Sequence, residues 1–84
     1  MEILQSLEFR KAYKKLHSNQ RTTVNEEIRR VLADPTIGED LKGVFVHKFK
    51  LNHQLYLLAY TFGEEKLTLL ALGVHENFYR DLKR

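Results

Sequence analysis

The sequence predicts an α+β fold in which an antiparallel sheet packs against a helical hairpin. Two stretches with apolar residues at helical spacing come first, and three stretches of alternating or nearly continuous apolar residues follow. The predicted order is strand, helix, helix, strand, strand, strand, helix. At 84 residues the chain has the size of one small domain, so we expect residues 1–84 to fold as a single unit.

The first part of the chain predicts a short strand followed by the helical hairpin. Ile3 and Leu4 among polar neighbours indicate a strand within residues 1–7, which would join an edge of the sheet. The hydroxyl of Ser6 can cap the first helix, which should end near residues 17–18. Its apolar stripe falls at i, i+3, i+4 and i+7, and consists of Phe9, Ala12, Tyr13 and Leu16.

A second helix should begin near Ser18 or Asn19 and end at Asp34-Pro35, because the residue before a proline avoids the α region. Its apolar residues again have helical spacing, at Val24, Ile28, Val31 and Leu32. Two amphipathic helices joined by a short connection predict an antiparallel pair whose apolar sides need a sheet to cover them.

Residues 36–43 are predicted to form a loop, and residues 44–51 a strand with period-2 alternation. Phe45, His47, Phe49 and Leu51 should share one face, and Val44, Val46, Lys48 and Lys50 the other. Residues 54–62 are too apolar for an exposed strand and are placed centrally. A third strand over 66–74 and a short helix over 76–84 complete the chain, with turns at Asn52-His53 and Gly63-Glu64.

The composition excludes several classes of function. There is no cysteine, hence no disulfide framework and no thiolate metal site. Four histidines occur, but their spacing matches no common metal pattern, so we expect neither a metal nor another cofactor. No stretch approaches the roughly 20 apolar residues that span a bilayer, and no targeting segment is visible. We therefore expect a cytoplasmic protein without a membrane partner.

The position of the charges is more informative than the net charge of +3. No acidic residue occurs from Leu41 to Gly63, and the basic residues of this stretch are Lys42, His47, Lys48, Lys50 and His53. Such a segment is either a surface that faces an anion or a pair of buried strands with few charges of any kind. The residues alone leave both interpretations open.

A second group of polar residues follows the last predicted strand. His75 and Tyr79 are four residues apart and would face the same way on a helical turn, with Arg80 beside them. A histidine next to a phenol and cations suits proton transfer at a phosphodiester. The alternative is structural, with His75 capping the helix and Tyr79 packing as a half-buried aromatic.

Several short motifs occur in a fixed order along the chain. They are Leu41-Lys42-Gly43, the basic run over residues 47–50, the run Leu57-Leu58-Ala59-Tyr60, and Leu72-Gly73-Val74-His75 followed by Tyr79. In these motifs and in its order of elements, the chain resembles the RelE/ParE superfamily of bacterial type II toxins. The resemblance covers nearly the whole chain. It implies a toxin neutralised by a cognate antitoxin protein. RelE-type members cut mRNA on the ribosome without a metal, whereas ParE-type members poison DNA gyrase.

The resemblance also implies roles for individual residues. Lys48 and Lys50 match paired lysines that help to activate the 2′-hydroxyl and stabilise the charged phosphate. His75 is similar to a histidine that YafQ-type relatives place after Leu-Gly as a general acid or base, and Tyr79 matches a functional aromatic position. We therefore expect these four residues to be catalytic. We expect RNA contacts from six more residues: His47, His53, Arg80, Lys11, Lys14 and Lys15.

One departure from the RelE pattern keeps other functions open. RelE-type members have an arginine that clamps the scissile phosphate where this chain has Leu57. The leading interpretation is a ribosome-dependent mRNA endonuclease that inhibits translation. The main alternative is a ParE-like gyrase inhibitor without nuclease activity, and a third is an inactive relative that only binds nucleic acid.

Overall fold

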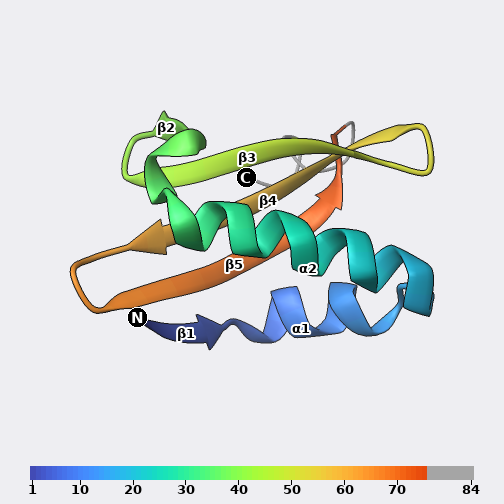
Figure 1. Cartoon of the computed structure of the whole chain (residues 1–84), viewed down its shortest axis with the longest axis horizontal. Coiled ribbons are helices and arrows are strands. Elements are labelled where there is room, and N and C mark those ends of the chain that lie inside the picture. Colours follow the sequence, from blue (N-terminus) through green and yellow to red (C-terminus); the bar gives the residue numbers. More distant parts are fainter. Residues whose placement is uncertain (76–84) are drawn as a thin grey trace.

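In the computed structural model, which describes residues 1–75, a five-stranded sheet carries two helices on one face (Figure 1). The strand order is β1-β5-β4-β3-β2. In chain order the elements are β1 (Glu2–Gln5), α1 (Leu7–Lys14), α2 (Ser18–Ala33), the 3₁₀ turn η1 (Pro35–Ile37), β2 (Glu39–Leu41), β3 (Val44–Leu51), β4 (Gln54–Phe62) and β5 (Lys66–Val74). The helix predicted over residues 76–84 lies outside the described residues.

The predicted α+β class is confirmed, as are the three long strands, whose bounds match the alternation in the sequence. β4 is central, as its apolar composition indicates, and pairs antiparallel with β3 and β5. The turn between β3 and β4 is Asn52-His53, where both residues have positive φ angles of 51° and 66°. A two-residue turn of this kind matches the twist of antiparallel strands and fixes their register.

The first strand joins an edge of the sheet, as predicted, but it pairs parallel with β5, so the sheet is mixed and not purely antiparallel. Parallel neighbours need a long crossover, and the helices with β2–β4 supply it. Ser6 fastens this edge, because its backbone N–H donates to Leu69 O at 2.9 Å and its Oγ donates to Leu70 O at 2.6 Å. The same Oγ accepts from the N–H of Phe9 at 3.0 Å and so caps α1, as predicted.

The segment predicted as a loop over residues 36–43 contains η1 and the short strand β2. β2 pairs antiparallel with β3 through a turn at Lys42-Gly43, where both φ angles are positive, 55° and 95°. The carboxylate of Asp40 accepts the Gly43 N–H at 2.9 Å and closes this turn. Only three residues of β2 pair with β3. A strand this short shows no recognisable alternation of polar and apolar residues, so the sequence does not predict it.

The main core lies between the helices and the sheet. Its buried residues are Phe9, Val24, Val31, Phe49, Leu51, Leu58, Tyr60, Leu67, Leu69 and Leu72. Burying side chains of this size stabilises the fold by roughly 1.5–3 kcal/mol each. The two helices are also tied to each other, since the Tyr13 hydroxyl donates to Asn25 Oδ1 at 2.9 Å and the Arg21 guanidinium donates to Lys14 O at 3.0 Å.

Tyr60 closes one end of this core. Its fully buried hydroxyl donates to Pro35 O at 2.7 Å and accepts from the Gly38 N–H at 3.1 Å, so β4 holds the turn that follows α2. Burial raises the pKa of the Tyr60 phenol. The Asp34 carboxylate accepts the N–H and hydroxyl of Thr36, and these hydrogen bonds lower its pKa. A Cβ on Gly38 would lie 2.5 Å from the Tyr60 hydroxyl oxygen, so this close approach needs glycine.

Candidate functional site

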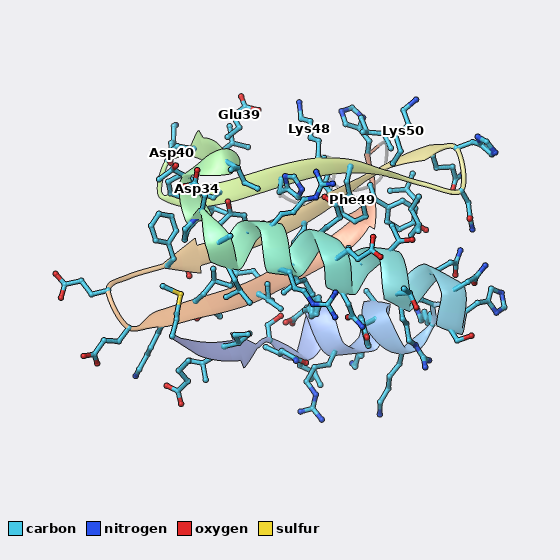
Figure 2. All side chains as sticks on the ribbon, in the orientation of Figure 1. Asp34, Glu39, Asp40, Lys48, Phe49 and Lys50 are labelled. Carbon is cyan, nitrogen blue, oxygen red and sulfur yellow. The ribbon has the colours of Figure 1, made fainter. Side chains whose placement is uncertain are left out.

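The two lysines of β3 lie on the face of the sheet opposite the helices. Figure 2 shows Lys48 and Lys50 pointing away from the helices, while Phe49 between them points towards α2. Both lysines are exposed, and Phe49 is buried in the main core. Residues two apart on a strand are separated by roughly 7 Å, so the two ammonium groups can approach one phosphate. The predicted division of this strand into two faces is therefore confirmed.

A β-bulge in β5 changes which residues of the strand face the core. Leu69 pairs with Tyr60 and Ala71 with Ala59, so Leu70 is an extra residue without a partner on β4. Before the bulge the core-facing residues are Leu67 and Leu69; after it, Leu72 takes that role. The inward positions thus change from odd to even numbers, as expected where an extra residue interrupts the pairing.

His75 follows the strand after this change of phase. Gly73 pairs with Leu57 and Val74 with Tyr56, and β5 ends at Val74, so His75 is the first residue after the paired part of the strand. Leu55, the neighbour of Tyr56 on β4, pairs with Lys50 of β3.

A cavity shows which residues His75 lies near. His53, Gln54, Leu55, Val74 and His75 line a space of about 330 Å³ at the end of the sheet where the β3–β4 turn lies. His53 is exposed on that turn, and its positive φ angle allows the chain to reverse there. The structure therefore brings two of the predicted residues, His53 and His75, to one cavity with Lys50 in the adjoining strand.

The electrostatic surroundings of the two lysines differ. The Lys48 ammonium lies 3.7 Å from Glu39 Oε2 on β2, and both side chains are substantially exposed, at 45% and 57%. An exposed pair of this kind contributes at most about 1 kcal/mol. Lys50 makes no ion pair within residues 1–75. Lys50 is thus the more available of the two for an anion.

Leu57 occupies the position between Lys48 and Gly73 in the register. It is fully buried in a small apolar cluster with Val46 and Ala59. Leu57 therefore gives this position no charge.

His47 lies apart from the lysines. It shares the helix-covered face of β3, and its Nε2 is 2.7 Å from Glu27 Oε1 of α2, with both side chains only 14% exposed. The ring also stacks on Phe49 with 5.9 Å between centroids. These contacts attach α2 to β3, and the structure does not bring His47 together with Lys48, Lys50 or His75.

The predicted RNA contacts on the first helix also lie on the helix side. Lys11 and Lys14 are exposed on α1, and Lys15 follows at its C-terminus. Tyr79 and Arg80 lie outside the described residues. The predicted set therefore divides between a group on the lysine face and a basic group on α1.

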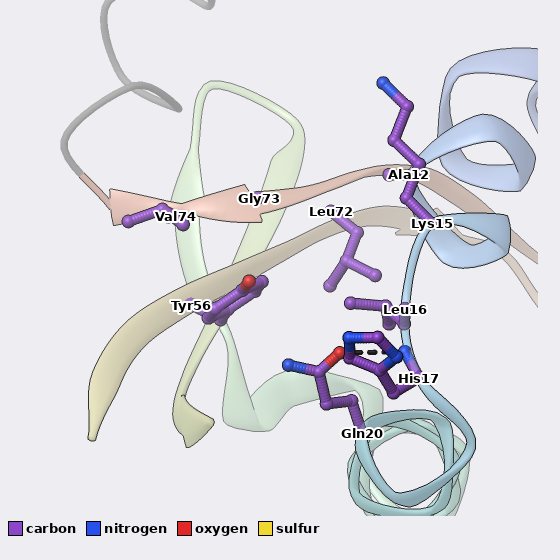
Figure 3. Close-up of a pocket in the computed structure, with 9 residues that line it drawn as sticks. All are labelled: Ala12, Lys15, Leu16, His17, Gln20, Tyr56, Leu72, Gly73 and Val74. Carbon is purple, nitrogen blue, oxygen red and sulfur yellow. Dashed lines mark hydrogen bonds between the residues drawn. The ribbon is translucent and has the colours of Figure 1, made fainter. Parts of the chain in front are cut away.

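Sequence reasoning missed a cavity on the helix-covered side of the sheet, next to the cavity that contains His53 and His75. Ala12, Lys15, Leu16, His17, Gln20, Tyr56, Leu72, Gly73 and Val74 line a space of about 380 Å³ (Figure 3). The sequence pattern marks Tyr56 only as part of an apolar strand. Tyr56 lies two residues before Leu58, so the alternation of the strand predicts that both side chains face the core. This spacing is the feature of the sequence that could have pointed to Tyr56.

Within residues 1–75, no group of three His, Cys, Asp or Glu side chains is arranged to hold a metal ion. Over the same residues, no helix is both long and apolar enough to cross a membrane.

The fold is that of bacterial RelE-type toxins. A chain of the intact E. coli RelBE toxin-antitoxin complex matches with a TM-score of 0.70 and 22% identity, covering 86% of this chain and 93% of that one. The YoeB/ParE toxin from Agrobacterium tumefaciens matches with a TM-score of 0.71 and 17% identity, covering 89% of this chain and 99% of that one. The isolated E. coli RelE toxin matches with a TM-score of 0.69 and 22% identity, covering 99% of this chain and 96% of that one. At these identities the likeness shows the fold.

The sequence identifies the family. A family described as the ParE-like toxin of type II bacterial toxin-antitoxin systems matches residues 3–83. Among curated protein sequences, none matches the chain. The protein belongs to the ParE-like toxin family and is a type II toxin of the RelE/ParE superfamily, as the sequence motifs indicated.

Proposed function

We propose that this toxin is a ribosome-dependent endoribonuclease that cleaves mRNA without a metal ion and so inhibits translation. The observation that carries the proposal is the cavity lined by His53, Leu55 and His75, because Leu55 pairs with Lys50, whose exposed side chain points away from the helices as that of Lys48 does. A histidine at this cavity and cations on the adjoining strand are the groups that cleavage at a phosphodiester needs.

The chemistry follows from these residue types. The 2′-oxygen attacks phosphorus, loses its proton to a base and displaces the 5′-oxygen, which takes a proton from an acid. The products are a 2′,3′-cyclic phosphate and a free 5′-hydroxyl. His75 serves as the acid or base, because imidazole exchanges protons near neutral pH. Lys50, assisted by Lys48, stabilises the negative charge that develops at phosphorus.

The remaining predicted residues belong to the same proposal. Tyr79 completes the reacting group, and His53 and Arg80 contact the RNA near it. Lys11, Lys14 and Lys15 bind ribosomal or messenger RNA phosphates through a salt-dependent attraction. His47 acts on RNA only indirectly, because its pairing with Glu27 holds β3 in place.

A cognate antitoxin is the proposed protein partner, and the cytoplasm the proposed location. A chain of similar fold occurs in the E. coli RelBE toxin-antitoxin complex. The exposed lysines of β3 favour an acidic partner segment. A small acidic protein encoded beside this one should bind the toxin and abolish its activity. Binding that survives reversal of both lysine charges would place the antitoxin elsewhere.

The test of the function compares wild type with His75→Ala and Lys50→Ala in induced cells. Lys66→Ala is the control, because Lys66 is an exposed strand lysine at the other end of the sheet. Wild type and Lys66→Ala should arrest growth with shortened mRNA, and the two site variants should grow. Full toxicity of both site variants would contradict the assignment.

Gyrase inhibition is the second candidate, favoured by the buried Leu57 at the centre of the lysine face. A toxin of that kind needs no reacting groups. It would induce the DNA-damage response while protein synthesis continues, whereas an mRNA nuclease would stop incorporation of labelled amino acids first. Measuring both responses in one culture separates the two functions.

A further inference from the structure

The cavity on the helix side, missed by sequence reasoning, has the construction of a binding site. It lies where the corner between α1 and α2 meets β4 and β5 (Figure 3). Its volume of about 380 Å³ falls within the roughly 300–1,000 Å³ of small-molecule sites. Leu16, Leu72 and Val74 supply an apolar lining, to which a tyrosine ring and a side-chain amide are added.

The amide belongs to Gln20 on the first turn of α2. Its Oε1 accepts the backbone N–H of His17 at 2.8 Å, which fixes the plane of the carboxamide. The NH₂ group is then directed into the cavity towards Tyr56 (Figure 3). It makes no hydrogen bond within residues 1–75, so two donors are available to a ligand.

The aromatic ring belongs to Tyr56, which forms the wall opposite Gln20. Phe49 supports it from the core side, with 6.1 Å between ring centroids. The Tyr56 hydroxyl has no hydrogen-bond partner in the described part of the chain. A planar ring, aliphatic contacts and a fixed donor pair form the kind of surroundings that hold an unstacked nucleobase.

The cavity is adjacent to the proposed reaction site. Val74 lines both this space and the one that contains His53 and His75. Lys15 stands at the rim, with its ammonium outside the apolar part of the cavity (Figure 3). A strand whose phosphate lies near His75 can therefore place a neighbouring base against Tyr56 and a further phosphate near Lys15.

We propose that this cavity binds one nucleobase of the RNA next to the scissile phosphodiester, stacked on Tyr56 and hydrogen-bonded through a carbonyl oxygen or ring nitrogen to Gln20. The inference rests on the proposed function for the identity of the strand. It adds a determinant of sequence preference, because bases differ in the acceptors they present to a fixed amide.

The first test is a titration of the isotope-labelled full chain with four homopolymeric trinucleotides, 2′-O-methylated so that they cannot be cleaved. Nuclear magnetic resonance follows the Gln20 side-chain amide and the Tyr56 ring. At least one trinucleotide should shift both signals. Failure of all four to bind, or shifts confined to the lysine face, would overturn the inference.

The variants sharpen the test. Gln20→Glu keeps an oxygen for the His17 N–H but removes the donors, while Asn19→Asp adds the same charge one residue away and keeps the oxygen that accepts the Gln20 N–H. Gln20→Glu should weaken the best trinucleotide at least tenfold more than Asn19→Asp does. If both variants weaken trinucleotide binding equally, the added negative charge explains the loss, and a hydrogen bond from Gln20 to the base is contradicted.

Tyr56→Leu should weaken binding by about 5- to 100-fold, the usual loss of one stacking partner. Gln5→Ala, at an exposed residue of β1, is the neutral control. If the toxin binds trinucleotides in this way but leaves mRNA intact, the nucleobase site is supported and the proposed nuclease activity is contradicted. If Tyr56→Leu and Gln20→Glu cleave mRNA as well as wild type does, the nuclease activity is supported and the nucleobase site is contradicted.

Discussion

The two ends of the sheet are built differently. At the clamped end, defined by Asp34–Gly38 and Tyr60, the buried phenol and the Asp34 carboxylate have their partners inside the chain. At the open end, defined by Lys50, the Asn52-His53 turn, Tyr56 and His75, two adjacent cavities share Val74 in their linings. Lys50 and the Tyr56 hydroxyl lack hydrogen-bond and ion-pair partners within residues 1–75.

This difference separates stability from function. Polar groups at the clamped end form hydrogen bonds with one another, so removing them should lower the free energy of unfolding. At the open end, the Lys50 ammonium and the Tyr56 hydroxyl contribute little to folding and are available to a ligand. Changes at the clamped end should therefore lower stability and spare chemistry, and changes at the open end should do the reverse.

The largest expected effect is the loss of catalysis in Lys50→Ala. Removing one group that stabilises developing charge typically costs about 10²–10³-fold in rate. The melting temperature should stay within a degree or two of wild type, because the side chain is exposed and without a partner in the described residues. Single-turnover cleavage on purified ribosomes measures the first quantity and calorimetry the second. Lys66→Ala should leave both unchanged.

The next effect is on stability at the clamped end. Gly38→Ala would place a methyl group 2.5 Å from the Tyr60 hydroxyl oxygen, so the hydrogen bonds to Pro35 and Gly38 must break. The free energy of unfolding should fall by about 1–3 kcal/mol, the cost of leaving buried polar groups without partners. Denaturant unfolding measures it.

Two further variants control this result. A Cβ on Gly63 meets nothing within 4 Å, so Gly63→Ala should be nearly neutral. Tyr60→Phe should destabilise to a similar extent as Gly38→Ala, and the double variant should add little to either single change, since both remove the same contacts. Full additivity would show that the clamp is not a single unit.

The Tyr60 clamp also predicts a pH dependence. Because burial raises the pKa of this phenol above its usual value of 10.0, the folded state holds the proton longer than the unfolded state does. The stability that Tyr60 contributes is therefore present below pH 10.0 and is lost as the pH rises through the folded-state pKa. Unfolding free energies measured between neutral and alkaline pH should converge for wild type and Tyr60→Phe. A constant difference would contradict the buried position of the phenol.

The smallest expected effect concerns Lys48 and its neighbour Glu39. Glu39→Gln removes the carboxylate 3.7 Å from the Lys48 ammonium. RNA affinity should rise by no more than about 5-fold, since exposed pairs are worth at most about 1 kcal/mol. The gain should fade as salt is added. Glu65→Gln, in an exposed turn at the opposite end, should change affinity less.

Sequence alone could predict the features that depend on local periodicity. The alternation over residues 44–51 correctly placed Lys48 and Lys50 opposite Phe45 and Phe49. The helix stripes and the central position of β4 followed from the same reasoning. The catalytic roles assigned to these lysines and to His75 stay predictions.

Other features depend on partners distant in the chain. The bulge at Leu70 exists only because β4 supplies one fewer residue at Ala59/Tyr60, and no local pattern in β5 reveals it. The parallel pairing of β1 and the contact between Tyr60 and Gly38 are likewise long-range. His47 shows the same limit, because its acidic partner Glu27 comes from α2 and not from its own acid-free segment.

The most direct test of the central claim is the chemistry of the RNA ends made by the purified toxin on ribosomes loaded with one defined mRNA. Wild type should release fragments with 2′,3′-cyclic phosphate and 5′-hydroxyl termini, and His75→Ala and Lys50→Ala should lose this product at least 100-fold, within the range expected for such groups. Intact mRNA with wild type, or 5′-phosphate ends, would contradict a site built from Lys48, Lys50 and His75.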